Sequence, residues 1–158
     1  MKLQLWNNRF LYTYLLLAGL VYVYLVLRAC YIPPVHDEAS TFFHYINHGE
    51  FIPGQALFDA NNHILNSFLS SYFVKIFGVN TLSIRLANLL LFPVYAYFLF
   101  LFTYKVEHAF LKVVLVLTGL GMHGFIEYFA YSRGYGMSMA FLMAGLYFAY
   151  KFVSENRV

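Results

Sequence analysis

Charged residues are scarce in this chain of 158 residues, where Asp, Glu, Lys and Arg together make up 11%. A typical soluble domain carries about 25%, whereas 61% of this chain is hydrophobic and 22% is aromatic. The composition excludes an ordinary soluble domain and predicts a membrane protein, in which Tyr and Trp favour the interfaces. Its net charge of +3 comes from scattered basic residues, which argues against a nucleic-acid partner.

Cysteine is nearly absent as well, because Cys30 is the only one. An internal disulfide is therefore excluded, and the redox compartment cannot be read from cysteine usage. A signal-peptide cleavage site is also lacking. The first apolar run covers residues 10–27, which is longer than the roughly 7–15 residues of a signal sequence core, and no small-x-small motif follows it. We interpret this run as a retained transmembrane helix.

Four apolar segments approach the length of about 20 residues that a spanning helix needs, at residues 10–27, 82–104, 113–131 and 135–152. The predicted fold is therefore all-α, a polytopic membrane helix bundle formed by a single module over residues 1–158. Pro93 lies inside the second segment and is expected to kink it. Only Ser132, Arg133 and Gly134 separate the third and fourth segments, which predicts a tight helical hairpin.

The distribution of basic residues predicts the orientation. With both termini in the cytoplasm, six basic residues fall inside and four fall outside, and the inner side of a membrane protein is normally the more positive. No Lys or Arg occurs from residue 29 to residue 74. We therefore expect a multi-pass protein of the cell membrane whose first loop, about residues 29–80, is extracytoplasmic.

Two amphipathic helices are predicted in this loop. Ala39, Phe42, Phe43 and Ile46 recur at helical spacing. A second helix is expected after the potential capping residues Asn61 and Asn62. Its apolar face comprises Ile64, Leu65, Phe68, Leu69, Tyr72, Phe73 and Ile76, and its polar face comprises Asn66, Ser67, Ser70, Ser71 and Lys75. Such helices suit the outer membrane surface.

The adjacent carboxylates Asp37 and Glu38 are the first candidates for chemistry. The loop holds four of the seven acidic residues, including Asp59, and four of the six histidines. A carboxylate beside an acceptor hydroxyl can act as a general base. The alternative is that Asp37 caps the helix that follows, and the two roles do not exclude each other.

His44 and His48 are four residues apart and would share a helix face. Together with an acidic residue or His63, such a pair could bind a divalent metal. The alternative is a polar helix face turned towards water or lipid headgroups. A motif such as HExxH is absent, so we predict no metal.

Ionisable residues within or near the spans form a third group, because such residues are costly in a membrane and usually functional. His123 and Glu127 share a face of the third segment, and Arg133 lies at the hairpin tip between glycines. Arg133, Arg85 and Lys75 could form a cationic rim that binds phosphate. Alternatively, Glu127 pairs with Arg133, and the arginine only anchors the hairpin at the interface.

These motifs, taken in order, resemble a known family. The relevant residues are Asp37-Glu38-Ala39, Asn62-His63-Ile64-Leu65-Asn66-Ser67, Phe77-Gly78 with Ser83 and Arg85-Leu86-Ala87-Asn88, and Ser132-Arg133-Gly134-Tyr135-Gly136. The chain resembles the N-terminal part of the polytopic glycosyltransferases of the GT-C fold, which use polyprenyl-phosphate sugars. It is most similar to protein O-mannosyltransferases, the lipid A aminoarabinose transferase and the lipopolysaccharide-core galacturonosyl transferases.

The resemblance implies that Asp37 activates the acceptor and that Arg133 lies near the donor phosphate. His63 matches the His of a His-Pro-Pro element in which Ile64 and Leu65 replace the prolines. Metal use varies within this fold, so no metal is inferred from the resemblance, and we predict no cofactor. Family members are longer, so a further C-terminal segment or a second chain is expected as a partner.

The sequence thus predicts a membrane glycosyltransferase that moves a sugar from a polyprenyl-phosphate carrier to a lipid, glycan or protein acceptor on the extracytoplasmic face. The catalytic residues would be Asp37 and Glu38. The alternative is a non-catalytic membrane subunit whose loop binds a partner protein or lipid. The sugar and the acceptor cannot be named from the residues.

Overall fold

The structure is a computed structural model that describes residues 2–52, 54–57 and 62–155. All the secondary-structure elements of these residues are helices, which confirms the predicted all-α class. In chain order they are α1 (Lys2–Tyr31), α2 (His36–Thr41), η1 (Phe42–Ile46), α3 (Ile64–Phe77), α4 (Thr81–Leu89), α5 (Phe92–Tyr104), α6 (Ala109–Gly121), α7 (His123–Ile126), η2 (Glu127–Ala130) and α8 (Tyr135–Glu155).

Three helical segments of the described chain are long and apolar enough to cross a membrane. They are Asn8–Tyr31 in α1, Thr81–Tyr104 in α4 and α5, and Tyr135–Glu155 in α8. The predicted third span, by contrast, is broken. Ala109–Gly121 and His123–Ala130 meet at an angle of 53°, so a fourth span requires the bent pair to cross as one.

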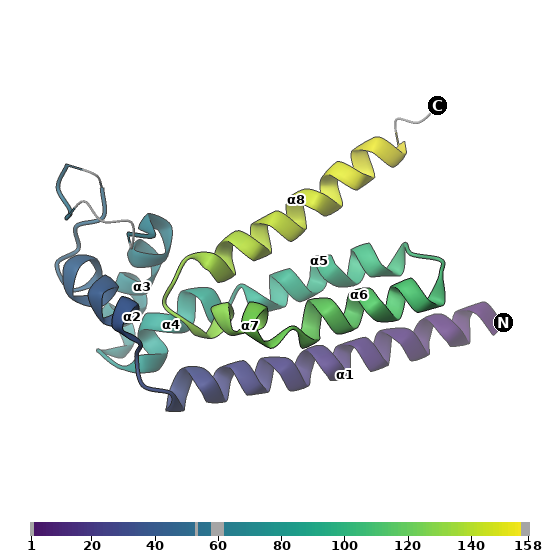
Figure 1. The fold of residues 1–158 in the computed structure, drawn as a ribbon, viewed down its shortest axis with the longest axis horizontal. Helices are drawn as coiled ribbons and strands as arrows, with labels where there is room; N and C mark the ends of the chain where they lie inside the picture. Colours follow the sequence, from purple (N-terminus) through teal and green to yellow (C-terminus); the bar gives the residue numbers. More distant parts are fainter. Residues whose placement is uncertain (1, 53, 58–61, 156–158) are drawn as a thin grey trace.

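The long helices α1, α5 and α6 run side by side, and α8 is inclined to them but packs on α5, with the Phe102 and Tyr150 ring centres 5.8 Å apart (Figure 1). The short helices α2, α3 and α4 gather at one end of this bundle. The N-terminus, the turn between α5 and α6, and the end of α8 all lie at the other end. The predicted loop therefore forms a compact layer at a single end of the apolar helices.

The second span is interrupted close to Pro93, as the sequence predicts. Helix α4 ends at Leu89, α5 begins at Phe92, and Pro93 lies in the first turn of α5. Proline has no backbone N–H to donate to the preceding turn, and its ring crowds the carbonyl there. The first turn of a helix tolerates it because those N–H groups lack intrahelical acceptors in any case.

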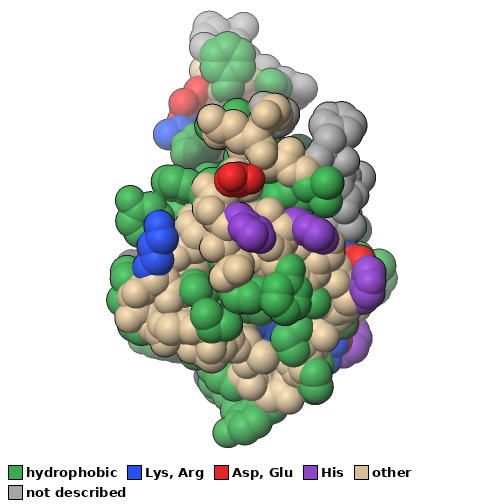
Figure 2. Space-filling view, turned by 90° about the vertical axis from the view of Figure 1, so that its left-hand side faces the viewer, with side chains coloured by type: hydrophobic (Ala, Val, Ile, Leu, Met, Phe, Trp, Pro, Cys, Tyr) green, Lys and Arg blue, Asp and Glu red, His purple; other side chains and the backbone are tan. Residues whose placement is uncertain are grey.

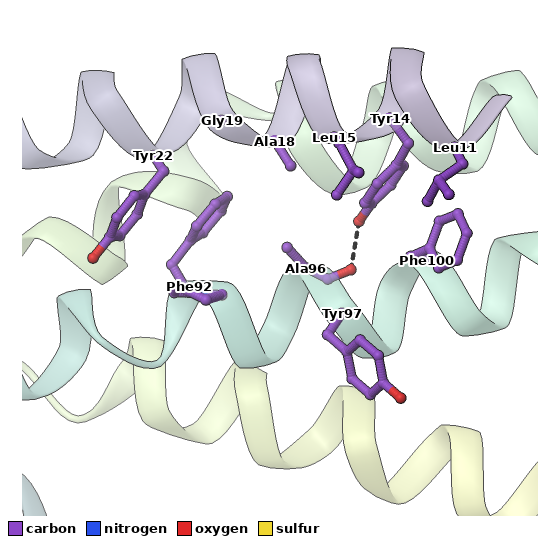
Figure 3. A pocket seen from close by; sticks show the side chains of 11 residues that line it. Leu11, Tyr14, Leu15, Ala18, Gly19, Tyr22, Phe92, Ala96, Tyr97 and Phe100 are labelled. Atoms are coloured by element: carbon purple, nitrogen blue, oxygen red, sulfur yellow. Dashed lines mark hydrogen bonds between the residues drawn. The ribbon is translucent and has the colours of Figure 1, made fainter. Parts of the chain in front are cut away.

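Helices α1 and α5 leave an apolar groove of about 410 Å³ between them (Figure 3). The Tyr14 hydroxyl, which belongs to α1, donates to the carbonyl oxygen of Ala96 at 2.6 Å. This bond satisfies a polar group among apolar side chains, where a hydroxyl without a partner would be costly. It also ties the N-terminal half of α1 to α5.

The predicted apolar stripe of the first loop helix is wrong in part. The segment divides into the α-helix α2 and the π-helical turn η1. Phe43 is 61% exposed, whereas Glu38 and Thr41 are fully buried. Glu38 turns inwards because it has an ionic partner in the layer below. Ile46 is buried and His44 and His48 are exposed, as the predicted stripe requires.

Helix α3 forms where predicted, and its polar face packs inwards. Its buried residues are Asn66, Ser67, Ser70 and Ser71. Much of the opposite apolar face is exposed, including Ile64, Leu65, Phe68, Tyr72 and Ile76. Its placement on a membrane surface stays a prediction. The N-cap is His63 rather than Asn62, and Asn61 and Asp59 lie outside the described residues.

Candidate functional site

The segments that carry the sequence motifs meet at the loop end of the bundle. Figure 2 looks at this end, where acidic and histidine side chains lie among hydrophobic ones. Within it, Glu38 of α2 contacts both Arg85 of α4 and the turn before α8. Asp37, its neighbour, contacts Arg133 in that same turn. Three segments far apart in the sequence therefore form one cluster.

Glu38 and Arg85 form a buried ion pair at the base of the cluster. Both side chains have zero exposure. The guanidinium donates from Nε to Glu38 Oε1 at 2.8 Å and from Nη2 to Oε2 at 2.7 Å, a bidentate geometry that favours a strong bond. Its remaining N–H groups donate to the backbone carbonyls of Ala29, Ile32 and Pro33.

The Glu38 carboxylate also accepts two backbone hydrogen bonds. The N–H of Ser132 donates to Oε1 at 2.6 Å, and the N–H of Val35 donates to Oε2 at 3.0 Å. Val35 is the N-cap of α2, so the capping carboxylate is Glu38. The alternative that Asp37 caps this helix is therefore wrong. Glu38 fixes where α2 starts and where the turn before α8 lies.

Asn88 of α4 holds the same turn from its other side. Its amide donates to the Tyr131 carbonyl at 3.0 Å and to Asn66 Oδ1 at 2.6 Å. Its own Oδ1 accepts from the Met137 N–H at 3.0 Å. A Cβ on Gly136 would stand 2.9 Å from that oxygen, which explains why the position suits glycine.

The upper part of the cluster is an ion pair between Asp37 and Arg133. Nη1 of Arg133 contacts Oδ2 of Asp37. The Asp37 side chain is 49% exposed, whereas that of Arg133 is 13% exposed. The carboxylate thus remains open to a ligand, and the guanidinium lies at the boundary between the buried cluster and the surface.

Tyr135 and His63 flank this pair. The Arg133 guanidinium lies 5.4 Å from the centre of the Tyr135 ring, and Nη2 lies 3.4 Å from its hydroxyl. Burial alone would lower the pKa of Arg133, but the bonds with Tyr135 and Asp37 outweigh it and raise that pKa. Arg133 is therefore a permanent cation at this site.

His63 packs edge-on against Tyr135, with ring centres 4.9 Å apart. Burial, and then the positive charge of Arg133, lowers the pKa of His63 below 6.5. Its Nε2 is buried and has no hydrogen-bond partner among the described residues. The ring is accordingly neutral at neutral pH, and its Nε2 is a buried polar atom whose hydrogen bond is unmade.

A cleft of about 200 Å³ opens beside these residues between α3 and α8. Its polar lining comprises His63, Asn66 and Ser138, and its apolar lining includes Ile64, Leu65 and Phe141. A Cβ on Gly134 would lie 3.0 Å from that of His63, so glycine keeps the backbone close to the imidazole. The cleft thus suits a molecule with a polar head and an apolar tail.

Several predicted site residues lie outside this arrangement. Arg85 is fully buried and bonded to Glu38, so the predicted rim of Arg85, Lys75 and Arg133 is not formed. The cause is that Glu38 outcompetes water for Arg85. Lys75 is exposed on α3, 6.0 Å from the Tyr72 ring. Asn62 donates to the Phe51 carbonyl at 2.9 Å and thereby closes the loop.

The predicted histidine pair does not share a helix face. His44 is in η1, which ends at Ile46, so His48 falls in the turn that follows, and both are exposed. Among the described residues no group of three His, Cys, Asp or Glu side chains could hold a metal ion.

Glu127 belongs to a separate cluster near the C-terminal end of α1. It contacts His123 at 2.8 Å, as the spacing of the two residues predicts, and Arg28 at 3.1 Å. The alternative pairing of Glu127 with Arg133 is therefore wrong, since each has another partner. Sequence reasoning missed the pair with Arg28, although two opposite charges near one membrane boundary favour pairing.

Comparison of the chain with protein-family models, with curated proteins and with solved structures finds no match.

Proposed function

We propose that the chain is an integral membrane glycosyltransferase that takes a sugar from a polyprenyl-phosphate carrier. The observation that carries the proposal is the pair formed by half-exposed Asp37 and Arg133. A base and a phosphate-binding cation lie side by side above a rigid buried cluster. Sugar transfer from a lipid phosphate needs these two functions next to each other.

In the proposed reaction, an acceptor hydroxyl attacks the anomeric carbon of the donor sugar. Asp37 takes the hydroxyl proton as the new bond forms. The bond between that carbon and the phosphate oxygen breaks, and the polyprenyl phosphate leaves with the electron pair. Arg133 stabilises its developing charge, because a planar guanidinium matches phosphate oxygens in two hydrogen bonds.

The ion pair suggests how binding of the donor could free Asp37 to act as the base. Arg133 contacts Asp37 in the structure described here. A donor phosphate bound to Arg133 would compete with Asp37 for the guanidinium and release the carboxylate to accept a proton. The neighbouring cleft would receive the sugar phosphate at His63 and the first isoprene units at Leu65 and Phe141.

The alternative is a non-catalytic membrane subunit in which the Asp37–Arg133 pair only joins α2 to the turn before α8. A measurement of donor binding distinguishes the glycosyltransferase from the non-catalytic subunit. We expect the purified protein to bind a polyprenyl-phosphate sugar, Arg133→Lys to weaken this binding and Arg133→Ala to weaken it further. Replacing Lys151, at the opposite end of the bundle, is the control and should leave binding unchanged. Equal donor binding by wild type and Arg133→Ala would favour the subunit.

A further inference from the structure

A second charged cleft lies at the opposite end of the bundle, far from the candidate site. It has a volume of about 220 Å³ and is formed by α1 and the start of α6. Its lining residues are Arg9, Phe10, Thr13, Ala109, Lys112 and Val113. The N-terminus and the turn between α5 and α6 lie at this end (Figure 1).

Three sources of positive potential converge on this cleft. Arg9 is exposed on α1, and Lys112 is half-buried on α6, with Nζ held 4.9 Å from the Phe10 ring centre. The third source is the N-terminus of α6, where Ala109 lines the cleft and the N-cap His108 makes no side-chain capping bond. Helix N-termini present free N–H groups and a positive dipole to anions.

Negative side chains do not balance these charges within the described part of the chain. The lining holds no carboxylate, and neither Arg9 nor Lys112 forms an ion pair there. A second cleft at this end is partly balanced, since its wall holds Lys105 and Lys151, and Lys151 lies 3.7 Å from Glu155. The wall of the α1–α6 cleft thus holds two basic side chains and no carboxylate, which favours binding of an external anion.

The surroundings of the cleft indicate what kind of anion it takes. Beyond Arg9 and Lys112, the adjoining surfaces of α1 and α6 are apolar and exposed, with Tyr12 at 69%, Leu16 at 63% and Leu117 at 60%. A ligand in this position must carry a negative head above an apolar chain. Basic clefts between membrane helices are known to hold anionic lipid headgroups.

We propose that this cleft binds the phosphate of an anionic phospholipid, with its acyl chains along α1 and α6. Each basic residue near a membrane surface strengthens such binding about 5-fold, so the two together contribute about 30-fold. The site is independent of the proposed sugar transfer. It would anchor the end of the bundle for which we predict a cytoplasmic location.

The test is lipid retention by the purified chain in detergent, measured by native mass spectrometry with phosphatidylglycerol or phosphatidylcholine of identical chains. We expect wild type to retain phosphatidylglycerol preferentially and the Arg9→Gln/Lys112→Gln variant to lose most of this preference. Lys151→Gln is the matched control and should behave as wild type, because its charge is already balanced by Glu155. Arg9→Lys should also behave as wild type.

Three results would overturn the proposal. The first is undiminished phosphatidylglycerol retention by the double variant, and the second is equal retention of both lipids by wild type. The third is full displacement of phosphatidylglycerol by an equal concentration of soluble glycerol phosphate, which would indicate a simple anion site. If the double variant does not fold, the single variants Arg9→Gln and Lys112→Gln provide the test. Each should bind phosphatidylglycerol about 5-fold more weakly than wild type.

Discussion

Asp37 and Glu38 are neighbours in the sequence, yet their carboxylates have opposite surroundings. Glu38 has zero exposure and is bonded to Arg85 and to two backbone N–H groups. Asp37 is 49% exposed, and its ion pairs among the described residues are with two side chains at the rim of the cluster, Arg133 and His36. Glu38 therefore holds the fold of this end together, and Asp37 is the carboxylate to which we assign the proposed role of general base.

The first prediction follows from the buried pair. Removing one member of a buried ion pair leaves an uncompensated charge and costs about 3–5 kcal/mol. We therefore expect Glu38→Gln to lower the free energy of unfolding in detergent by roughly this amount. Replacing both members, as in Glu38→Gln with Arg85→Met, should cost less than replacing Glu38 alone.

Glu155→Gln is the control, because its pair with Lys151 is an exposed i,i+4 contact worth about 0.3–0.5 kcal/mol. If Glu38→Gln unfolds at the same denaturant concentration as Glu155→Gln, the pair does not stabilise the fold.

Part of this site follows from the sequence alone. The apolar runs predict the helices, and the glycines beside Arg133 predict a close approach of the hairpin. The partner of Arg85 could not be predicted, since any of the acids was available and only the packing of α2 on α4 selects Glu38. The outward apolar face of α3 follows from its pattern. The third span breaks at Met122, whose backbone is extended, and the glycines at 119, 121 and 124 are the signal that the prediction of one continuous span did not use.

A second prediction concerns pH. The pKa of His63 is lowered by burial and by Arg133, so the unfolded chain binds a proton more readily than the folded one. Above pH 6.5, the ordinary pKa of histidine, His63 is neutral in both the folded and the unfolded chain, and the fold keeps its full stability. This stability is lost as the pH falls through the lower pKa that His63 has in the folded chain. Acidification from about pH 7 to about pH 5 should therefore reduce the melting temperature of wild type more than that of His63→Gln.

The other histidines are present in both proteins, so the difference between wild type and variant isolates His63. His48→Gln replaces an exposed histidine and is the control. Its melting temperature should change with pH as that of wild type does. The same dependence in His63→Gln as in wild type would show that the His63 proton is not linked to folding.

A third prediction tests the orientation. Gln55 and Glu107 are exposed and lie in turns at opposite ends of the bundle. In a chain with Cys30→Ala, a membrane-impermeant thiol reagent should label Gln55→Cys from outside intact cells. It should label Glu107→Cys only after the cells are opened. The reverse pattern would put the candidate site in the cytoplasm and contradict an extracytoplasmic acceptor.

The most direct test of the account is the rate of sugar transfer from a polyprenyl-phosphate donor by Asp37→Asn in native membranes, compared with wild type. Asn keeps the size of Asp37 and can still bond to Arg133, but it cannot take a proton. Glu50→Gln, which neutralises an exposed acid of the same loop, is the control. We predict a loss of about 10²–10⁴-fold for Asp37→Asn, the usual contribution of a general base, with protein levels and the control unchanged. Transfer by Asp37→Asn within a few-fold of wild type would contradict the central claim.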